Sequence, residues 1–378
     1  MKKNIREIGY KEPRKWIYDL CAFLLEFYKG KIIVEGVEKI PEKGPMLILA
    51  NHTNYADPVY LAYAFHKYTK SKIHLNFMML DDFFGANTCF TKGFNKLANR
   101  VNSYQVNRER ITKNQRNFFK NILLDDFLAI FFTGTRSRDG RFSYMLREER
   151  PPTGLVHLAE LAQKESGNLV RILPVAITYD VLGSVTVTFD RHRTFKPRKV
   201  LINSRKKFAE DIINTIGQNV KVNLDSLFAN YLVQYAIQHE NDSKSAKLNL
   251  SIEKCQDDLY SIVNSLSEKN KININMALLD DIYFLDRFFA VSMYFNKKKA
   301  IEFAPGGKYI VDKERIKHPP CIAESRTKSE VKEMGLKEKI SYLMNVRTIN
   351  KNIMYNSNKI MHLNEVTKEV YEIIRRNN

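Results

Sequence analysis

The sequence has few cysteines and no long apolar run. Only Cys21, Cys89, Cys255 and Cys321 occur in 378 residues, and they lack the spacing of a zinc site. So few thiols argue against a disulfide scaffold and favour a reducing compartment. No uncharged apolar run reaches the roughly 18 residues that a bilayer-spanning helix needs. The charged N-terminus lacks the apolar region of a signal peptide, so we expect neither secretion nor a spanning helix.

Low-complexity blocks and internal repeats are also missing. The histidines other than His52 show no ligand spacing, so we expect no metal site. Hydrophobic residues make up 44% of the chain, which is enough for a buried core. The length fits one large domain, or a main domain with an appendage.

Basic residues exceed acidic ones, 61 to 42, which gives a formal net charge of +19. This excess favours an anionic partner: nucleic acid, a phosphate-rich cofactor, an acidic protein or a membrane surface. A basic stretch covers 191–207, but no recognisable nucleic-acid motif accompanies it. The ordinary interpretation of such a stretch is a solvated face.

Three regions follow from the patterning. Residues 1–30 contain an amphipathic helix at 14–28, which could dock on the rest of the chain or lie in a membrane interface. Residues 31–240 alternate between strand and helix patterns. The polar segment 241–247 is a reasonable linker, and 248–378 are predicted to be a mainly helical extension.

The middle region predicts an α/β fold with a central, mostly parallel sheet flanked by helices. Strand-like runs lie at 31–35, 46–50, 74–79, 103–106, 128–132, 170–178 and 185–189. Helical patterns lie after Pro58 and at 113–125, 153–164 and 224–237.

The most informative segment follows the apolar run at 46–50. His52 stands at a strand end, where loops expose side chains to ligands. Asp57, followed by Pro58, is a good N-cap for a helix. A carboxylate five residues after a histidine can also reach back and orient one ring nitrogen, leaving the other as a general base.

Three further segments leave strand-like runs. Val106-Asn107-Arg108 ends in arginine, Thr133-Gly134-Thr135-Arg136-Ser137-Arg138 enters a glycine-bearing loop, and Pro174-Val175 lies inside a strand-like run. Backbone N–H groups and guanidinium forks in such a loop suit a phosphate. Each segment alone is a weak signal, because an arginine after a strand is most often a solvated surface residue.

Together and in this order, the four segments resemble the glycerolipid acyltransferases, which include glycerol-3-phosphate and lysophosphatidate (1-acylglycerol-3-phosphate) acyltransferases. His52 and Asp57 match the HX4D motif of that family, and the other segments match its second, third and fourth blocks. The resemblance covers about 30–200. It implies acyl transfer from acyl-CoA or acyl-carrier protein as co-substrate, with no further cofactor, in phospholipid biosynthesis.

The resemblance also implies roles for single residues. His52 would be the general base and Asp57 its orienting carboxylate. Arg108, Arg136 and Arg138 would grip the phosphate of a glycerophosphate acceptor, and Thr133, Gly134 and Thr135 would form the oxyanion or acceptor loop. The partners expected are the acyl donor, the acceptor and an anionic membrane surface rather than nucleic acid. The expected location is peripheral, on the cytoplasmic side of a membrane.

Thr133 departs from the family, whose third block commonly has Glu before the glycine. A neutral, shorter side chain there bears on acceptor choice, and it motivates the alternative of a non-catalytic member that binds lipid or membrane. The fourth block and 222–228 favour glycerol-3-phosphate as acceptor, whereas the Gly134–Gly140 segment also fits a lysophosphatidate acyltransferase.

Overall fold

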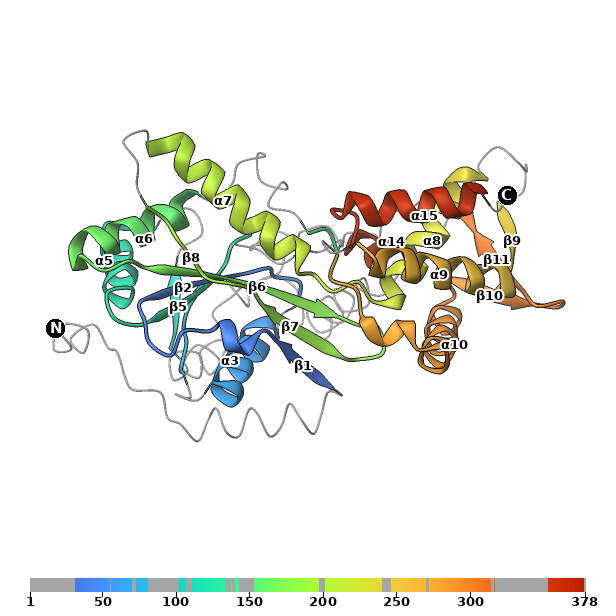
Figure 1. Cartoon of the computed structure of the whole chain (residues 1–378), viewed down its shortest axis with the longest axis horizontal. Helices are drawn as coiled ribbons and strands as arrows, with labels where there is room; N and C mark the ends of the chain where they lie inside the picture. Colours follow the sequence, from blue (N-terminus) through green and yellow to red (C-terminus); the bar gives the residue numbers. More distant parts are fainter. Residues whose placement is uncertain are drawn as a thin grey trace, which may run out of the picture. The chain divides into compact units, whose positions relative to one another are not determined.

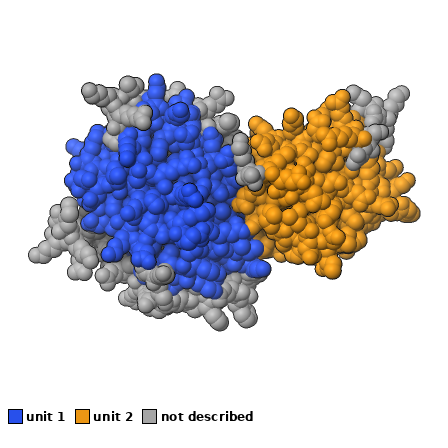
Figure 2. Space-filling model, viewed as in Figure 1, with its two compact units in different colours: residues 1–136, 144–178, 185–219 blue, residues 137–143, 179–184, 220–378 orange. Residues whose placement is uncertain are grey.

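The structure of the chain is a computed structural model. It describes residues 31–54, 56–69, 73–80, 102–106, 111–133, 137, 140–142, 153–196, 201–239, 246–269, 272–313, 316 and 353–376. The amphipathic helix expected within 1–30 lies outside these residues. The described part divides into two compact units, shown in Figure 2. Unit 1 comprises 1–136, 144–178 and 185–219, and unit 2 comprises 137–143, 179–184 and 220–378.

Unit 1 is built on a sheet to which eight of the described strands contribute. Its order is β1-β7-β6-β2-β5-β3-β4, and β8 pairs with β6. The strands are β1 (Ile32–Glu35), β2 (Met46–Ala50), β3 (Asn76–Leu80), β4 (Ser103–Val106), β5 (Phe127–Phe131), β6 (Arg171–Tyr179), β7 (Val185–Phe189) and β8 (Arg193–Thr194). β2 runs parallel to both neighbours, β5 and β6, while β8 is antiparallel to β6. The predicted α/β fold with a mostly parallel sheet is confirmed.

Helices cover both faces of this sheet. They are α3 (Asp57–Tyr68), α5 (Lys113–Ile122), α6 (Thr153–Ser166) and α7 (Leu201–Gln218), with a short 3-10 helix at Val37–Lys39. Figure 1 shows α5, α6 and α7 on one side and α3 on the other. The chain moves along the sheet in one direction from β2 to β3, and in the opposite direction from β4 through β5 to β6. Because crossovers between parallel strands are right-handed, the helices of these two sets of crossovers lie on opposite faces of the sheet.

Strand β2 lies in the middle of the sheet because its residues suit burial on both faces. All five side chains of Met46–Ala50 are buried, as expected for an interior parallel strand. Neighbouring β6 is also interior, although it contains Pro174, which sequence alone would place on an edge. The carboxyl end of β2, where His52 follows, is therefore fixed from both sides.

Unit 2 is mainly helical, as predicted, but it also contains a small sheet that the helical patterning did not predict. Its helices are α8 (Leu224–Gln238), α9 (Ile252–Ser267), the 3-10 helix η2 (Met276–Leu279), α10 (Asp281–Lys297), α14 (Ile353–Asn358) and α15 (Asn364–Arg376). Strands β9 (Lys247–Ser251), β10 (Ile301–Ala304) and β11 (Lys308–Asp312) form an antiparallel sheet in the order β10-β11-β9.

The compact units do not follow the expected division at 240–248. Helix α8 belongs to unit 2, and nearly all of its residues are buried. Leu227, Phe228 and Leu232 join a core shared with α9, α10, α14 and α15. A helix that is buried around nearly its whole circumference must be covered on every side, so it groups with the elements that cover it.

Candidate functional site

Asn51 ties the end of β2 to β6. Its side-chain Nδ2 donates to the Ile177 carbonyl at 2.9 Å, and its Oδ1 accepts from the Ile177 N–H at 2.7 Å. The side chain is buried and continues the β2–β6 pairing one step beyond the strand. It therefore fixes the backbone from which His52 projects. The sequence signal for this role is a lone amide that directly follows a buried apolar strand, since a buried amide must be hydrogen-bonded.

Asp57 is the first residue of α3, not its N-cap as predicted. The N-cap is Ala56, and no side chain caps this end of the helix. The carboxylate instead turns back into the preceding loop. Its Oδ2 accepts hydrogen bonds from the backbone N–H groups of Thr53, at 2.7 Å, and Asn54, at 2.8 Å. The fully buried carboxylate thus organises the loop of 52–56 as well as the helix start.

The same carboxylate oxygen lies 2.7 Å from Nδ1 of His52. The imidazole stacks on Phe131 of β5, with ring centroids 4.5 Å apart, and its side chain is 12% exposed. Because Asp57 holds Nδ1, and no described residue bonds Nε2, the second ring nitrogen is open to a ligand. A buried carboxylate that accepts a hydrogen bond from Nδ1–H favours the tautomer in which Nε2 is a base.

Strands β2 and β5 meet at a topological switch point of the sheet. They are adjacent and parallel, yet the connection after β2 goes to one face and the connection after β5 goes to the other. Such a divergence leaves a crevice at the carboxyl ends of the strands, where open α/β sheets bind ligands. His52 and Thr133 each come two residues after one of these strands, so the topology brings both to this crevice.

Tyr60 lies one helical turn after Asp57 and is buried. Burial raises the pKa of its hydroxyl, and the charge of Asp57 raises it further. Tyr60 is therefore neutral at physiological pH. It adds a protonated phenol, not a second charge, near the carboxylate.

The remaining predicted site residues are placed only in part. Arg108, Gly134, Thr135, Arg136 and Arg138 lie outside the described residues. Strand β4, which precedes Arg108, is separated from β2 by β5 and β3. Strand β6, which carries Pro174 and Val175, is the direct neighbour of β2. The strand that leads into the third segment and the strand that carries the fourth are therefore the two neighbours of β2, while the strand before the second segment is separated from β2 by two others.

Residues 31–178 match the family model named Acyltransferase. The matched segment contains β1 to β6 and both members of the His52–Asp57 pair. Among solved structures, the chain is similar to the 1-acyl-sn-glycerophosphate (LPA) acyltransferase PlsC from Thermotoga maritima, at 16% identity and a TM-score of 0.36, over 53% of this chain and 78% of that chain. No curated protein matches the sequence.

The basic stretch at 191–207 lies beyond the residues that match the family model, and part of it forms ion pairs within unit 1. Arg205 donates to the buried carboxylate of Glu160, which also pairs with Lys164. Burial alone would raise the pKa of Glu160, but the hydrogen bonds from Lys164 and Arg205 bring it below its ordinary value. Lys206 and Lys207 are exposed, as expected for a solvated face.

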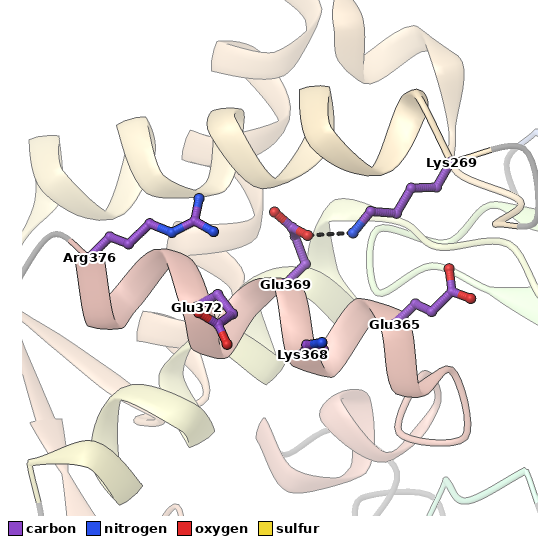
Figure 3. Close-up of a pocket in the computed structure, with 6 residues that line it drawn as sticks. All are labelled: Lys269, Glu365, Lys368, Glu369, Glu372 and Arg376. Atoms are coloured by element: carbon purple, nitrogen blue, oxygen red, sulfur yellow. Dashed lines mark hydrogen bonds and ion pairs between the residues drawn. The ribbon is translucent and has the colours of Figure 1, made fainter.

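Two further features of the described residues bear on function. No described helix is at once long and apolar enough to cross a bilayer. A shallow pocket in unit 2, shown in Figure 3, is lined by Lys269, Glu365, Lys368, Glu369, Glu372 and Arg376. Its lining is evenly mixed in sign, and Lys269 is paired with Glu369. Nothing in this lining resembles the His52–Asp57 pair of unit 1.

Proposed function

We propose that the chain is a glycerophosphate O-acyltransferase that moves an acyl group from acyl-CoA or acyl-carrier protein to glycerol-3-phosphate in phospholipid biosynthesis. The observation that carries the proposal is the 2.7 Å contact between His52 Nδ1 and the buried Asp57 carboxylate, at the carboxyl end of a central strand in the segment that matches the family model. This arrangement suits a base on Nε2. Such a direct transfer requires no serine or cysteine nucleophile.

The reaction is a direct transfer. His52 Nε2 removes the proton from an acceptor hydroxyl as that oxygen attacks the thioester carbonyl. The C–S bond then breaks, and the thiolate leaves with the proton from the imidazolium. Asp57 stabilises the imidazolium while it exists, as the carboxylate of a hydrolase triad does. General-base assistance of this kind contributes about 10²–10⁴ in rate.

Other residues would bind the reactants. In the proposal, Arg108, Arg136 and Arg138 hold the acceptor phosphate, because guanidinium groups form paired hydrogen bonds with phosphate oxygens. The loop that begins at Thr133 and continues through Gly134 and Thr135 meets the developing oxyanion with backbone N–H groups. The position of Thr133 after β5, beside the strand that leads to His52, supports this assignment. No metal takes part.

The acceptor has a second candidate. The Gly134–Gly140 segment also fits an enzyme that acylates lysophosphatidate, whereas the fourth segment favours glycerol-3-phosphate. A third possibility, in another class, is a member that binds lipid without turnover; the neutral Thr133 in place of glutamate motivates it. The +19 charge suits the acceptor phosphate, the phosphates of CoA, an acidic carrier protein and an anionic membrane face.

A panel of acceptors separates these candidates. Purified protein is given glycerol-3-phosphate, lysophosphatidate, dihydroxyacetone phosphate or a lysophospholipid, each with acyl-CoA and with acyl-carrier protein, and release of free thiol is followed. We expect thiol release that depends on glycerol-3-phosphate. A preference for lysophosphatidate replaces the proposal with its first alternative. Vesicle binding without turnover on any pair favours the non-catalytic alternative.

A further inference from the structure

Helix α10 of unit 2 has two apolar faces, only one of which is buried. Phe284, Phe288, Val291 and Phe295 fill the core of unit 2. The opposite face is open to solvent and is also apolar. Its exposed residues are Ile282 (75% exposed), Leu285 (37%), Phe289 (54%) and Met293 (58%).

These four side chains form a continuous stripe. Their spacing of three, four and four residues places them on one side of an α-helix, one above the other. At 1.5 Å per residue the stripe is about 16 Å long. Single exposed apolar residues are ordinary, but an aligned row of this length indicates an interaction surface.

Charge is distributed unevenly along the helix. Asp280, Asp281 and Asp286 lie at its N-terminal end, whereas the fifteen residues from Arg287 to Ile301 contain no acid. The C-terminal end carries three consecutive exposed lysines, Lys297, Lys298 and Lys299. The apolar stripe therefore leads into a cationic end, a pattern typical of helices that lie on anionic lipid.

We propose that the exposed face of α10, from Phe289 to Lys299, docks unit 2 on an anionic lipid bilayer. Phe289 and Met293 enter the boundary between headgroups and acyl chains, and the three lysines contact lipid phosphates. The acidic N-terminal end tilts toward water, so Ile282 inserts less deeply. A second copy of the chain is a less suitable partner for this face, because a formal charge of +19 opposes self-association and favours an anionic surface.

This inference does not depend on catalysis. It concerns a surface of unit 2, and binding to vesicles is measured without acyl donor or acceptor. A protein that binds vesicles through α10 but transfers no acyl group would refute only the proposed function. A protein that transfers acyl groups but leaves α10 in water would refute only the docking surface.

A fluorescent reporter tests the insertion directly. Trp16 is the only tryptophan of the chain, so Trp16→Phe gives a silent background. In that background, Phe289→Trp should shift its emission to the blue on vesicles of phosphatidylcholine and phosphatidylglycerol, and brominated lipid should quench it. Met361→Trp, at another exposed apolar position of unit 2, is the control and should show neither effect. An unshifted and unquenched Phe289→Trp overturns the proposal.

Binding measurements complete the test. Phe289→Ser with Met293→Ser should weaken partitioning into the anionic vesicles by about 10-fold or more, whereas Met361→Ser should not. Lys297→Gln with Lys298→Gln should weaken it by about 30-fold, at about 5-fold per lysine. The matched pair Lys206→Gln and Lys207→Gln, exposed on α7, should change it less. The proposal is refuted if the two lysine-pair variants weaken binding equally, or if the wild type binds pure phosphatidylcholine vesicles as tightly as anionic ones. It is also refuted if the protein is a dimer that the Phe289 and Met293 changes abolish.

Discussion

Asp57 has three hydrogen-bond donors on one carboxylate oxygen: the Nδ1 of His52 and the N–H groups of Thr53 and Asn54. The sequence predicts the pairing with His52 from spacing alone. It does not predict the two backbone contacts, because they depend on how the intervening loop folds. The buried carboxylate thus couples the shape of the loop to the orientation of the imidazole.

Asp57→Asn should therefore lower acyl transfer by about 10²–10⁴, because a neutral amide does not stabilise the imidazolium and, by donating to Nδ1, can favour the wrong tautomer. The turnover number at saturating donor and acceptor is the measurement. Asp257→Asn, at an exposed position of α9, is the matched control and should retain full activity. An Asp57→Asn enzyme that turns over at the wild-type rate would show that the carboxylate has no part in the reaction.

A second buried carboxylate, Asp225 of α8, lies in unit 2. Lys359 lies 3.2 Å from its Oδ2 and also donates to the carbonyl of Tyr179 at 3.0 Å. Burial raises the pKa of Asp225, and the charge of Lys359 only partly opposes this, so the pKa stays above its ordinary value. Ionised Asp225 thus destabilises the folded protein, and the charge of Lys359 offsets part of that cost.

Lys359→Met should destabilise the protein by about 3–5 kcal/mol near neutral pH, since it leaves an uncompensated buried charge. The pKa of Asp225 then rises further. Because the folded variant takes up a proton more readily than the unfolded chain, part of the loss should be recovered as the pH falls from about 8 to about 5. Urea unfolding at both pH values measures this, with exposed Lys368→Met as control. A loss that grows toward acid pH would contradict the account.

Among the secondary-structure elements, the strands of unit 1 are well predicted. The expected bounds of β2, β4 and β7 agree with the structure. For β2 and β7 the signal is a short apolar or β-branched run. The antiparallel sheet of unit 2 was missed. Its strands are only four or five residues long, and β9 and β11 show the alternation of a half-buried strand within a region of helical spacing. Gly306-Gly307, between β10 and β11, was the available hairpin signal.

Gly140 shows how an element of unit 2 constrains a motif residue. It ends the glycine-bearing segment that begins at Gly134, and its φ of +85° is in the left-handed region. A Cβ there would lie 2.2 Å from the carbonyl oxygen of Tyr355 in α14. The sequence alone suggests a phosphate loop, whereas the close approach of Tyr355 gives this glycine a packing role as well.

Gly140→Ala should accordingly destabilise the protein by more than Gly306→Ala. Both positions have positive φ and incur about 1 kcal/mol of backbone strain, but a Cβ on Gly306 meets nothing within 4 Å. We expect Gly140→Ala to cost at least about 1 kcal/mol beyond this control. Thermal unfolding of both variants provides the comparison. Equal melting temperatures of the two variants would mean that the backbone near Tyr355 moves away from the added Cβ without loss of stability.

At the scale of the whole molecule, the boundary of the C-terminal unit matters most. The sequence suggests a linker at 241–247, because that segment is polar and short. The structure places α8 with the helices that follow, since those helices supply its apolar surroundings. Composition marks a polar segment, but it does not reveal which neighbours bury the helix before it.

A chain truncated after His239 should therefore fail to give a folded monomer. It retains α8 but loses α9, α10, α14 and α15, which would expose Leu227, Phe228 and Leu232 to water. Size-exclusion chromatography of the truncated and full chains tests this, and we expect aggregation or loss of soluble protein. A soluble, active monomer of 1–239 would instead favour the boundary that the sequence suggests.

In the proposed function, His52 serves as the base of the acyl transfer. The most direct measurement is thiol release from acyl-CoA or acyl-carrier protein in the presence of glycerol-3-phosphate, compared between wild type, His52→Ala and the exposed control His192→Ala. We predict a loss of about 10²–10⁴ in the first variant, unchanged circular dichroism, and full activity in the control. A His52→Ala protein that transfers acyl groups at the wild-type rate would contradict the account.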